Sequence, residues 1–293
     1  MRILVSGASG LLGKELMREI SQRGHEAVGI GRRDADITDR AAVLSLVEAA
    51  KPDSILHCAA WTNVDAAEAP ENRPLVRAVN VGGTKNMAEA AARAGAKLLY
   101  LSTDYVFGGE GSAPRKPDDK RFAPLNFYGQ TKLEGERAVA EALDRFFIVR
   151  TSWLFGSGGK NFIRTMIDAG RKRDAVRVVN DQIGTPTYAR DLAGLLTDMV
   201  LTDRYGFYHA TNAEAEKGGY ISWYDLTKEV YRQIGCETEV IPVSTADYGC
   251  SAAVRPLNSR LDKSKLTEAG FQSLPDWKDA VRRYVAEIHE RES

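Results

Sequence analysis

The chain has 293 residues, and its 40 Lys and Arg residues balance 40 Asp and Glu residues, so the formal net charge at pH 7 is +0. Hydrophobic residues make up 43% and charged residues 27%, as is typical of globular proteins. This balance excludes the basic surface of a nucleic-acid or anionic-membrane binder, and no apolar run reaches the roughly 18 residues of a membrane span. Three scattered Cys and four scattered His predict neither a disulfide framework nor a metal site. We expect a cytoplasmic protein.

Strand and helix patterns alternate through the first half of the chain. Short β-branched runs predict strands at 3–5, 27–30, 54–57, 97–101 and 145–150. Amphipathic stretches between them predict helices at 12–23, 40–50, 75–94 and 126–143. Asp39 is the expected N-cap of the second helix. Alternation of this kind implies a parallel sheet with right-handed crossovers.

The second half of the chain is less regular. Helices are predicted at 162–173, 189–201, 223–234 and 275–292, with Ser222 as a cap, and a strand is predicted at 176–179. Residues 108–124 are rich in Gly, Pro, Lys and Asp, so they read as a long loop. That loop is either a lid beside a site or a disordered surface excursion.

A glycine-spaced turn follows the first strand and opens the first helix. Gly7 permits the tight turn, Gly10 lets the backbone approach a pyrophosphate, and Gly13 lets the helix pack closely on the strand. The helix N-terminus then offers free N–H groups to phosphates. The alternative is a purely structural turn. As a nucleotide site, the turn is expected to contact the cofactor through Gly7, Ser9, Gly10, Leu11 and Leu12.

The end of the second strand bears on the choice of cofactor. An acid usually stands here when the cofactor lacks a 2′-phosphate, but the sequence has Arg32 and Arg33. Guanidinium groups suit a phosphate, so we predict NADPH, with NADH also accommodated. Asp36 and Ile37 are expected to flank the adenine. Alternatively, both arginines merely face solvent.

Tyr128 and Lys132 are four residues apart, so on a helix they share one face. An ammonium ~4 Å away would contribute roughly 4 kcal/mol at a dielectric of ~20, enough to lower a phenol pKa of ~10 substantially. Thr103 follows a predicted strand, where it can present its hydroxyl to the same substrate oxygen. Together the three residues predict proton transfer in hydride chemistry at a carbonyl or alcohol.

These motifs resemble the extended short-chain dehydrogenase/reductase family and, within it, the dTDP-4-dehydrorhamnose reductases. The resemblance covers nearly the whole chain and rests on residues 7–13, 60–65, 102–107, 124–132, 150–153, 180–187 and 255–260. It implies reduction of the C4 ketone of dTDP-4-dehydro-β-L-rhamnose by NADPH, which is the last step of dTDP-rhamnose synthesis. The catalytic residues it implies are Thr103, Tyr128 and Lys132.

The resemblance also implies further contacts. On the cofactor side these are Ala59, Ala60, Thr62, Ser102, Tyr128 and Lys132, with Asn80 less direct. On the substrate side they are Val64, Thr103, Asp104, Tyr105, Trp153, Gln182 and Arg255. Trp153 could instead fill the core.

The chain departs from the family at two points. Some members form a dimer bridged by Mg²⁺ on glutamates; Glu15 matches one of these, but Arg190 stands where the other is expected. A cation beside Mg²⁺ is unfavourable, so we expect no metal site and a monomer or weak homodimer. His57 replaces a common Asn and is expected to lie behind the site.

Competing functions remain at this point. A sugar-nucleotide dehydratase would need Glu after Asp104, where this chain has Tyr105. An epimerase would retain NAD⁺, which the two arginines disfavour. A non-catalytic NADP-binding subunit, resembling the regulatory subunit of methionine adenosyltransferase, could keep the fold without turnover.

The expected fold is α/β, with a Rossmann-like doubly wound parallel sheet and a smaller C-terminal α/β lobe for the nucleotide sugar. We assign residues 1–153, with returning segments at about 180–203 and 238–256, to the cofactor domain. Residues at about 154–179, 204–237 and 257–293 are assigned to the smaller lobe.

Overall fold

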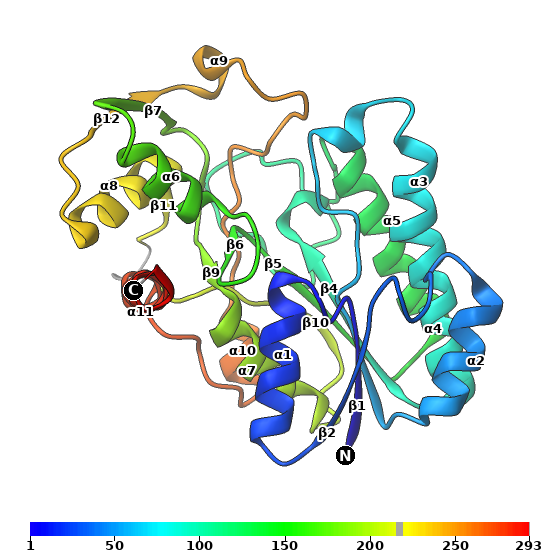
Figure 1. The fold of residues 1–293 in the computed structure, drawn as a ribbon. Helices are drawn as coiled ribbons and strands as arrows, with labels where there is room; N and C mark the ends of the chain where they lie inside the picture. Colours follow the sequence, from blue (N-terminus) through cyan, green and yellow to red (C-terminus); the bar gives the residue numbers. More distant parts are fainter. Residues whose placement is uncertain (215–218, 293) are drawn as a thin grey trace.

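The structure, a computed structural model, describes residues 1–214 and 219–292 (Figure 1). Its central sheet has six parallel strands in the order β10-β5-β4-β3-β1-β2. These are β1 (Arg2–Ser6), β2 (Glu26–Ile30), β3 (Ser54–His57), β4 (Lys97–Thr103), β5 (Phe146–Thr151) and β10 (Gly206–His209). The order reverses between β1 and β3, where doubly wound sheets bind their ligands. The expected fold class is confirmed.

Helices cover both faces of this sheet because its strands are apolar on both sides. Ile3 and Val5 pack with α1 (Leu11–Gln22) and α7 (Ala189–Val200) on one face. Leu4 packs on the other face with α2 (Arg40–Ala50) and α4 (Thr84–Ala94), and α5 (Phe127–Ala142) lies beside α4 (Figure 1). Asp39 caps α2 as predicted, accepting a hydrogen bond from the Ala42 amide at 3.1 Å.

The helix predicted at 75–94 is divided into three parts. They are α3 (Arg73–Arg77), a π-helical segment η2 (Ala78–Gly83) and α4. Within η2, Asn80 Oδ1 accepts from the Trp61 amide at 2.8 Å and its Nδ2 donates to Thr131 Oγ1 at 3.0 Å. The wider turn therefore ties the loop after β3 to α5, and π-turns often accompany functional sites.

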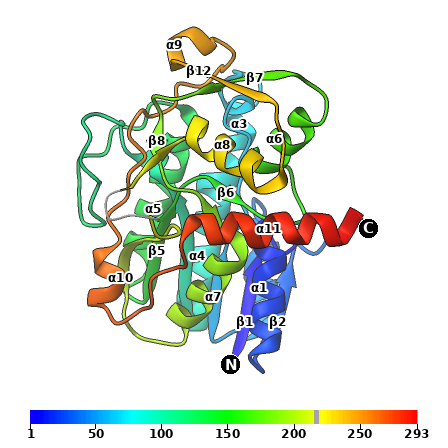
Figure 2. The same cartoon turned by 90° about the vertical axis from the view of Figure 1, so that its left-hand side faces the viewer.

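The smaller lobe gathers short strand pairs and three helices around its own core. The strand pairs are β7 (Ala175–Val179) with β12 (Glu239–Val243), β8 (Ile183–Gly184) with β11 (Ile221–Ser222), and β6 (Leu154–Phe155) with β9 (Thr187–Tyr188). The helices are α6 (Phe162–Gly170), α8 (Trp223–Ile234) and α11 (Trp277–Glu292). Ser222 caps α8 as predicted, and α11 runs across the molecule between this lobe and α1 and α7 (Figure 2).

Sheet pairing places two segments differently from the expected division of the chain. Strand β10, from the segment 204–237, forms the edge of the central sheet beside β5. Strand β12, from the segment 238–256, pairs with β7 in the smaller lobe. The short α9 (Thr245–Tyr248) follows β12, and α10 (Ser264–Glu268) packs against β10. We propose that residues 206–209 belong to the cofactor domain and residues 239–243 to the smaller lobe.

The long loop 108–124, all of it described, is anchored on the protein and contributes no residue to the cleft that holds the site. Arg115 is buried, and its backbone hydrogen-bonds with residues 260 and 262. The carbonyl of Pro117 accepts from the buried Arg150 at 2.9 Å. These bonds tie the middle of the loop to residues 260–262 and to β5. Separately, none of the helices in the described part of the chain has the length and apolar character that crossing a membrane requires.

Candidate active site

A cleft of about 1490 Å³ opens between the carboxyl ends of the central strands and the smaller lobe. Turns after β1, β2, β3 and β4 line it, together with one face of α5 and the segment after β5. Nearly all predicted site residues line it: Gly7, Ser9, Gly10, Leu11, Leu12, Arg32, Asp36, Ile37, Ala59, Ala60, Thr62, Val64, Ser102, Thr103, Asp104, Tyr105, Tyr128, Lys132 and Trp153. Gln182 and Arg255 are not among the lining residues.

The glycine turn packs closely on the neighbouring backbone and leaves the start of α1 without a side-chain cap. A Cβ on Gly7 would lie 2.9 Å from the Ala59 nitrogen, and one on Gly13 would lie 2.1 Å from the Gly7 oxygen. Gly7 also has φ +73°, which favours glycine. Gly10 is the N-cap of α1 and provides no side-chain hydrogen bond, so the first amides of the helix are open to a ligand. These residues fit a dinucleotide.

At the end of β2, carboxylates are engaged by the backbone while guanidinium groups stay exposed. Asp34 Oδ2 accepts from the Gly31 amide at 2.8 Å, and Asp36 Oδ1 accepts from the Thr38 amide at 2.9 Å. Hydrogen bonds from Thr38 lower the pKa of Asp36, and nearby Arg32 adds to the effect. Arg32 and Arg33 line the cleft, and neither makes a hydrogen bond to any described residue. The site therefore suits a 2′-phosphate.

The three candidate catalytic residues come from β4 and α5. Thr103 ends β4, and its hydroxyl donates to Asp104 Oδ1 at 3.0 Å. Tyr128 and Lys132 lie one turn apart on α5, which Asn126 caps by accepting from the Gly129 amide at 2.8 Å. Tyr128 meets Tyr105 edge to face, with ring centres 6.0 Å apart. The cleft thus holds two hydroxyls and an ammonium group together.

The pKa of Tyr128 lies above its ordinary value, whereas the sequence led us to expect a lowered one. Burial raises the pKa of the Tyr128 hydroxyl, and the Asp104 carboxylate adds to that rise, while a hydrogen bond with Thr103 opposes it. Lys132 Nζ instead donates to the Leu101 carbonyl oxygen at 2.7 Å. Burial lowers the pKa of Lys132 to about 7, against the opposing influence of Glu136. The raised pKa keeps the phenol of Tyr128 protonated at neutral pH.

Ser102, in β4, contacts a buried ion pair that was not predicted from the sequence. Arg150 and Glu136 are 1% and 2% exposed and form a two-pronged pair at 2.8 and 2.7 Å. The predicted cofactor residue Ser102 donates to Glu136 Oε1 at 2.6 Å. Ser102 lines the cleft, and the ion pair behind it could not be predicted because Arg150 and Glu136 lie on different elements.

Two tryptophans form a stack in the cleft. Trp153 has φ +50°, an unusual value for a residue with a side chain, and its ring lies 3.8 Å from that of Trp223 at an angle of 19°. Trp223 Nε1 donates to Gln182 Oε1 at 3.1 Å. Gln182 therefore reaches the cleft only through Trp223, which the sequence analysis did not identify.

Arg255 is engaged within the protein. Its Nη2 lies 2.7 Å from Asp65 Oδ2, and Asp65 Oδ1 also accepts from the Ala253 amide at 3.0 Å. The side chain of Arg255 remains 22% exposed. The pair fastens the segment before residue 258 to the loop after β3, close to Tyr105, whose pKa burial raises and Arg255 lowers.

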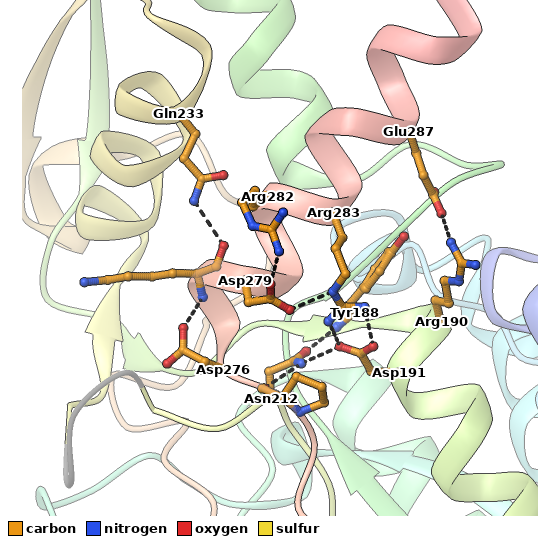
Figure 3. A network of polar contacts seen from close by, with 12 residues as sticks. Tyr188, Arg190, Asp191, Asn212, Gln233, Asp276, Asp279, Arg282, Arg283 and Glu287 are labelled. Atoms are coloured by element: carbon orange, nitrogen blue, oxygen red, sulfur yellow. Dashed lines mark hydrogen bonds and ion pairs between the residues drawn. The ribbon is translucent and has the colours of Figure 1, made fainter.

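At the position expected for the second metal ligand, Arg190 on α7 pairs with Glu287 of α11 at 2.9 Å (Figure 3). Asp191 beside it pairs with Arg283 at 2.6 Å. The other expected ligand, Glu15, pairs with Arg18 at 2.6 Å. Within residues 1–214 and 219–292, no three His, Cys, Asp or Glu side chains gather in a metal-binding arrangement.

The family model described as "RmlD substrate binding domain" matches residues 1–290. The chain belongs to this family. It is 43% identical over 286 residues to a dTDP-4-dehydrorhamnose reductase of Streptomyces griseus, covering 96% of this chain and 91% of that protein.

Other members of the family agree in fold and differ in name. The crystal structure of dTDP-4-dehydrorhamnose reductase from Bacillus anthracis in complex with NADP has a TM-score of 0.92 and 38% identity, covering 98% of this chain and 99% of that one. A dTDP-4-keto-6-deoxy-D-glucose reductase of Streptomyces niveus is 36% identical, covering 100% of this chain and 99% of that protein. The resemblance read from the sequence is confirmed.

Proposed function

We propose that this family member reduces the C4 ketone of dTDP-4-dehydro-β-L-rhamnose to dTDP-L-rhamnose with NADPH. The observation that carries the proposal is the single cleft that joins the glycine turn to Thr103, Tyr128 and Lys132. Relatives named for this reaction, and one solved with NADP, support it. The protein is thus an NAD(P)H-dependent oxidoreductase.

The residues of the chain divide the work of reduction. When bound, the reduced nicotinamide supplies hydride to the carbonyl carbon. Tyr128 delivers the proton to the carbonyl oxygen, which becomes the hydroxyl of a secondary alcohol. Thr103, next to Tyr128, turns its hydroxyl from Asp104 to the substrate and donates a hydrogen bond that orients the same oxygen. Lys132, held by the Leu101 carbonyl, binds the ribose hydroxyls and restores charge balance as the phenol gives up its proton.

The substrate occupies the part of the cleft between these residues and the smaller lobe. Val64, Asp104 and Tyr105, which follow β3 and β4, line the cleft together with Trp153, which follows β5, and Trp223 of α8. Arg255 either opens from Asp65 toward the substrate diphosphate or supports Tyr105 from behind, and Gln182 holds Trp223 in place.

The proposed setting is the cytoplasm, where nucleotide sugars and reduced nicotinamides are available. Three free cysteines, Cys58, Cys236 and Cys250, agree with a reducing compartment. Arg32 and Arg33 favour NADPH, with NADH used less well. Because Arg190 is paired with Glu287 at the family's metal position, we propose a monomer or weak homodimer without Mg²⁺.

The test is turnover by the purified protein. NADPH absorbance is followed after addition of the dTDP-4-keto-6-deoxy sugar made in situ by the upstream enzymes, and the sugar nucleotide formed is identified by NMR. Loss of NADPH with formation of dTDP-L-rhamnose is expected. Tight NADPH binding without turnover would contradict the proposal and favour a non-catalytic NADP-binding subunit.

A further inference from the structure

A glycine-rich loop of the smaller lobe, residues 156–160, lies against the first residue of α1. A Cβ on Gly156 would lie 3.3 Å from Leu11 Cδ2, and one on Gly159 would lie 3.7 Å from Leu11 Cβ. Lys160, the last residue of the loop, is exposed and lines the cleft. The backbone that carries Lys160 therefore passes the end of the glycine turn, where the first amides of α1 have no side-chain cap.

The loop is fixed from behind by α11 and by Asn161. Ser157 Oγ donates to Glu287 Oε2 at 2.7 Å, and the other oxygen of Glu287 accepts from Arg190. Asn161 Nδ2 bonds the Gly156 carbonyl and the Tyr284 hydroxyl at 2.9 and 2.8 Å. A loop of three glycines would otherwise be costly to order, so these bonds set where residue 160 lies.

The charges here suit an anion. Lys160 makes no hydrogen bond or ion pair with the residues that the structure describes, so its ammonium is available to a ligand. A second ammonium is near, because a Cβ on Gly158 would lie 3.3 Å from Lys14 Nζ. Positive charge beside the N-terminus of a helix complements a diphosphate.

We propose that Lys160 binds the diphosphate of the nicotinamide dinucleotide, and that Ser157 and Glu287 are positioning residues for the loop that carries it. The inference deepens the proposed function and rests on its cofactor. It makes the C-terminal helix part of the cofactor site, although that helix contributes no residue to the cleft lining.

The experiment measures dissociation constants of NADPH and NADH by fluorescence titration, without substrate. Lys160→Met weakens both cofactors by about tenfold, the worth of one charged hydrogen bond, because both carry the diphosphate. Lys160→Arg retains most of the affinity. Arg32→Met weakens NADPH alone, and Lys172→Met, at an exposed lysine of the smaller lobe, changes neither.

A double-mutant cycle tests the positioning residues. Ser157→Ala weakens NADPH about threefold in the wild-type background and has no further effect beside Lys160→Met. An equal loss in both backgrounds would show that the bond to Glu287 is only structural and would overturn the positioning role.

The remaining outcomes separate this inference from the proposed function. If the wild type binds neither cofactor, both fail. If the wild type binds and turns over but Lys160→Met binds both cofactors unchanged, only the inference fails. A raised KM for the sugar nucleotide with unchanged cofactor affinity would assign Lys160 to the substrate diphosphate and would likewise overturn it.

Discussion

The ammonium of Lys132 is held by the strand beside it: Nζ lies 2.7 Å from the Leu101 carbonyl oxygen and 4.0 Å from the centre of the Tyr100 ring. The contact fixes the position of a buried charge, and burial brings its pKa to about 7. The charge state of the site therefore changes within the working pH range.

The first prediction concerns this titration. Lys132 is protonated below about pH 7 and neutral above it, so kcat/KM should fall as pH rises through that value. The guanidinium of Lys132→Arg stays charged at all these pH values. The kcat/KM of this variant should therefore be lower than that of the wild type but should not fall as pH rises. The measurement is kcat/KM against pH for both proteins. The same alkaline limb in Lys132→Arg would assign the titration to another group.

The second prediction concerns the tryptophan stack. Trp223→Leu removes the ring that lies 3.8 Å from Trp153 and should raise the substrate KM about three- to tenfold, with little change in NADPH affinity. Trp223→Phe should keep most of the affinity. Circular dichroism of the coupled indoles reports the stack, and its loss should follow Trp223→Leu. An unchanged KM would show that the two stacked rings only fill space in the fold and do not contribute to substrate binding.

The third prediction concerns stability at acid pH. His57 is 0% exposed, bonded to Ser6 Oγ at 2.6 Å, and burial lowers its pKa to about 3. The unfolded chain binds this proton near pH 6.5, so stability is lost as pH falls from there toward 3. At pH 5 this loss amounts to about 2 kcal/mol of unfolding free energy, and it should be absent in His57→Asn. Urea unfolding at pH 7 and 5 measures it, and an unchanged pH dependence would contradict the assignment.

Local sequence signals were enough to predict that the glycine turn and the candidate catalytic residues line one cleft. The glycine turn and the Tyr128–Lys132 spacing each lie within a few residues, and their structures follow from one turn and one helix. The raised pKa of Tyr128 could not be predicted, because it depends on the nearby Asp104 carboxylate and on Lys132 Nζ being directed at the Leu101 carbonyl.

Features built from distant segments escaped prediction. Strand β10 has four residues, and β12 contains Pro242, which weakens a strand signal, so the strands that they pair with could not be predicted. The bond between Trp223 and Gln182 spans 41 residues. The break at η2 was hidden because the apolar periodicity continues through it; the pair Gly82–Gly83 was the available signal.

The fourth prediction concerns metal and assembly. With Arg190 paired to Glu287, addition of Mg²⁺ or EDTA should change neither turnover nor molecular mass. Light scattering after size exclusion, with and without each reagent, checks this. A dimer that appears with Mg²⁺ and vanishes with EDTA would show that a metal site forms despite the arginine.

The most direct test of the mechanism is Tyr128→Phe, which removes the proton donor and keeps the ring that meets Tyr105. NADPH affinity and substrate-dependent NADPH oxidation are measured on the variant and the wild type together. The account predicts nearly equal affinity and turnover lower by orders of magnitude, about 10²-fold or more. Turnover equal to the wild type would remove Tyr128 from the reaction and contradict the account.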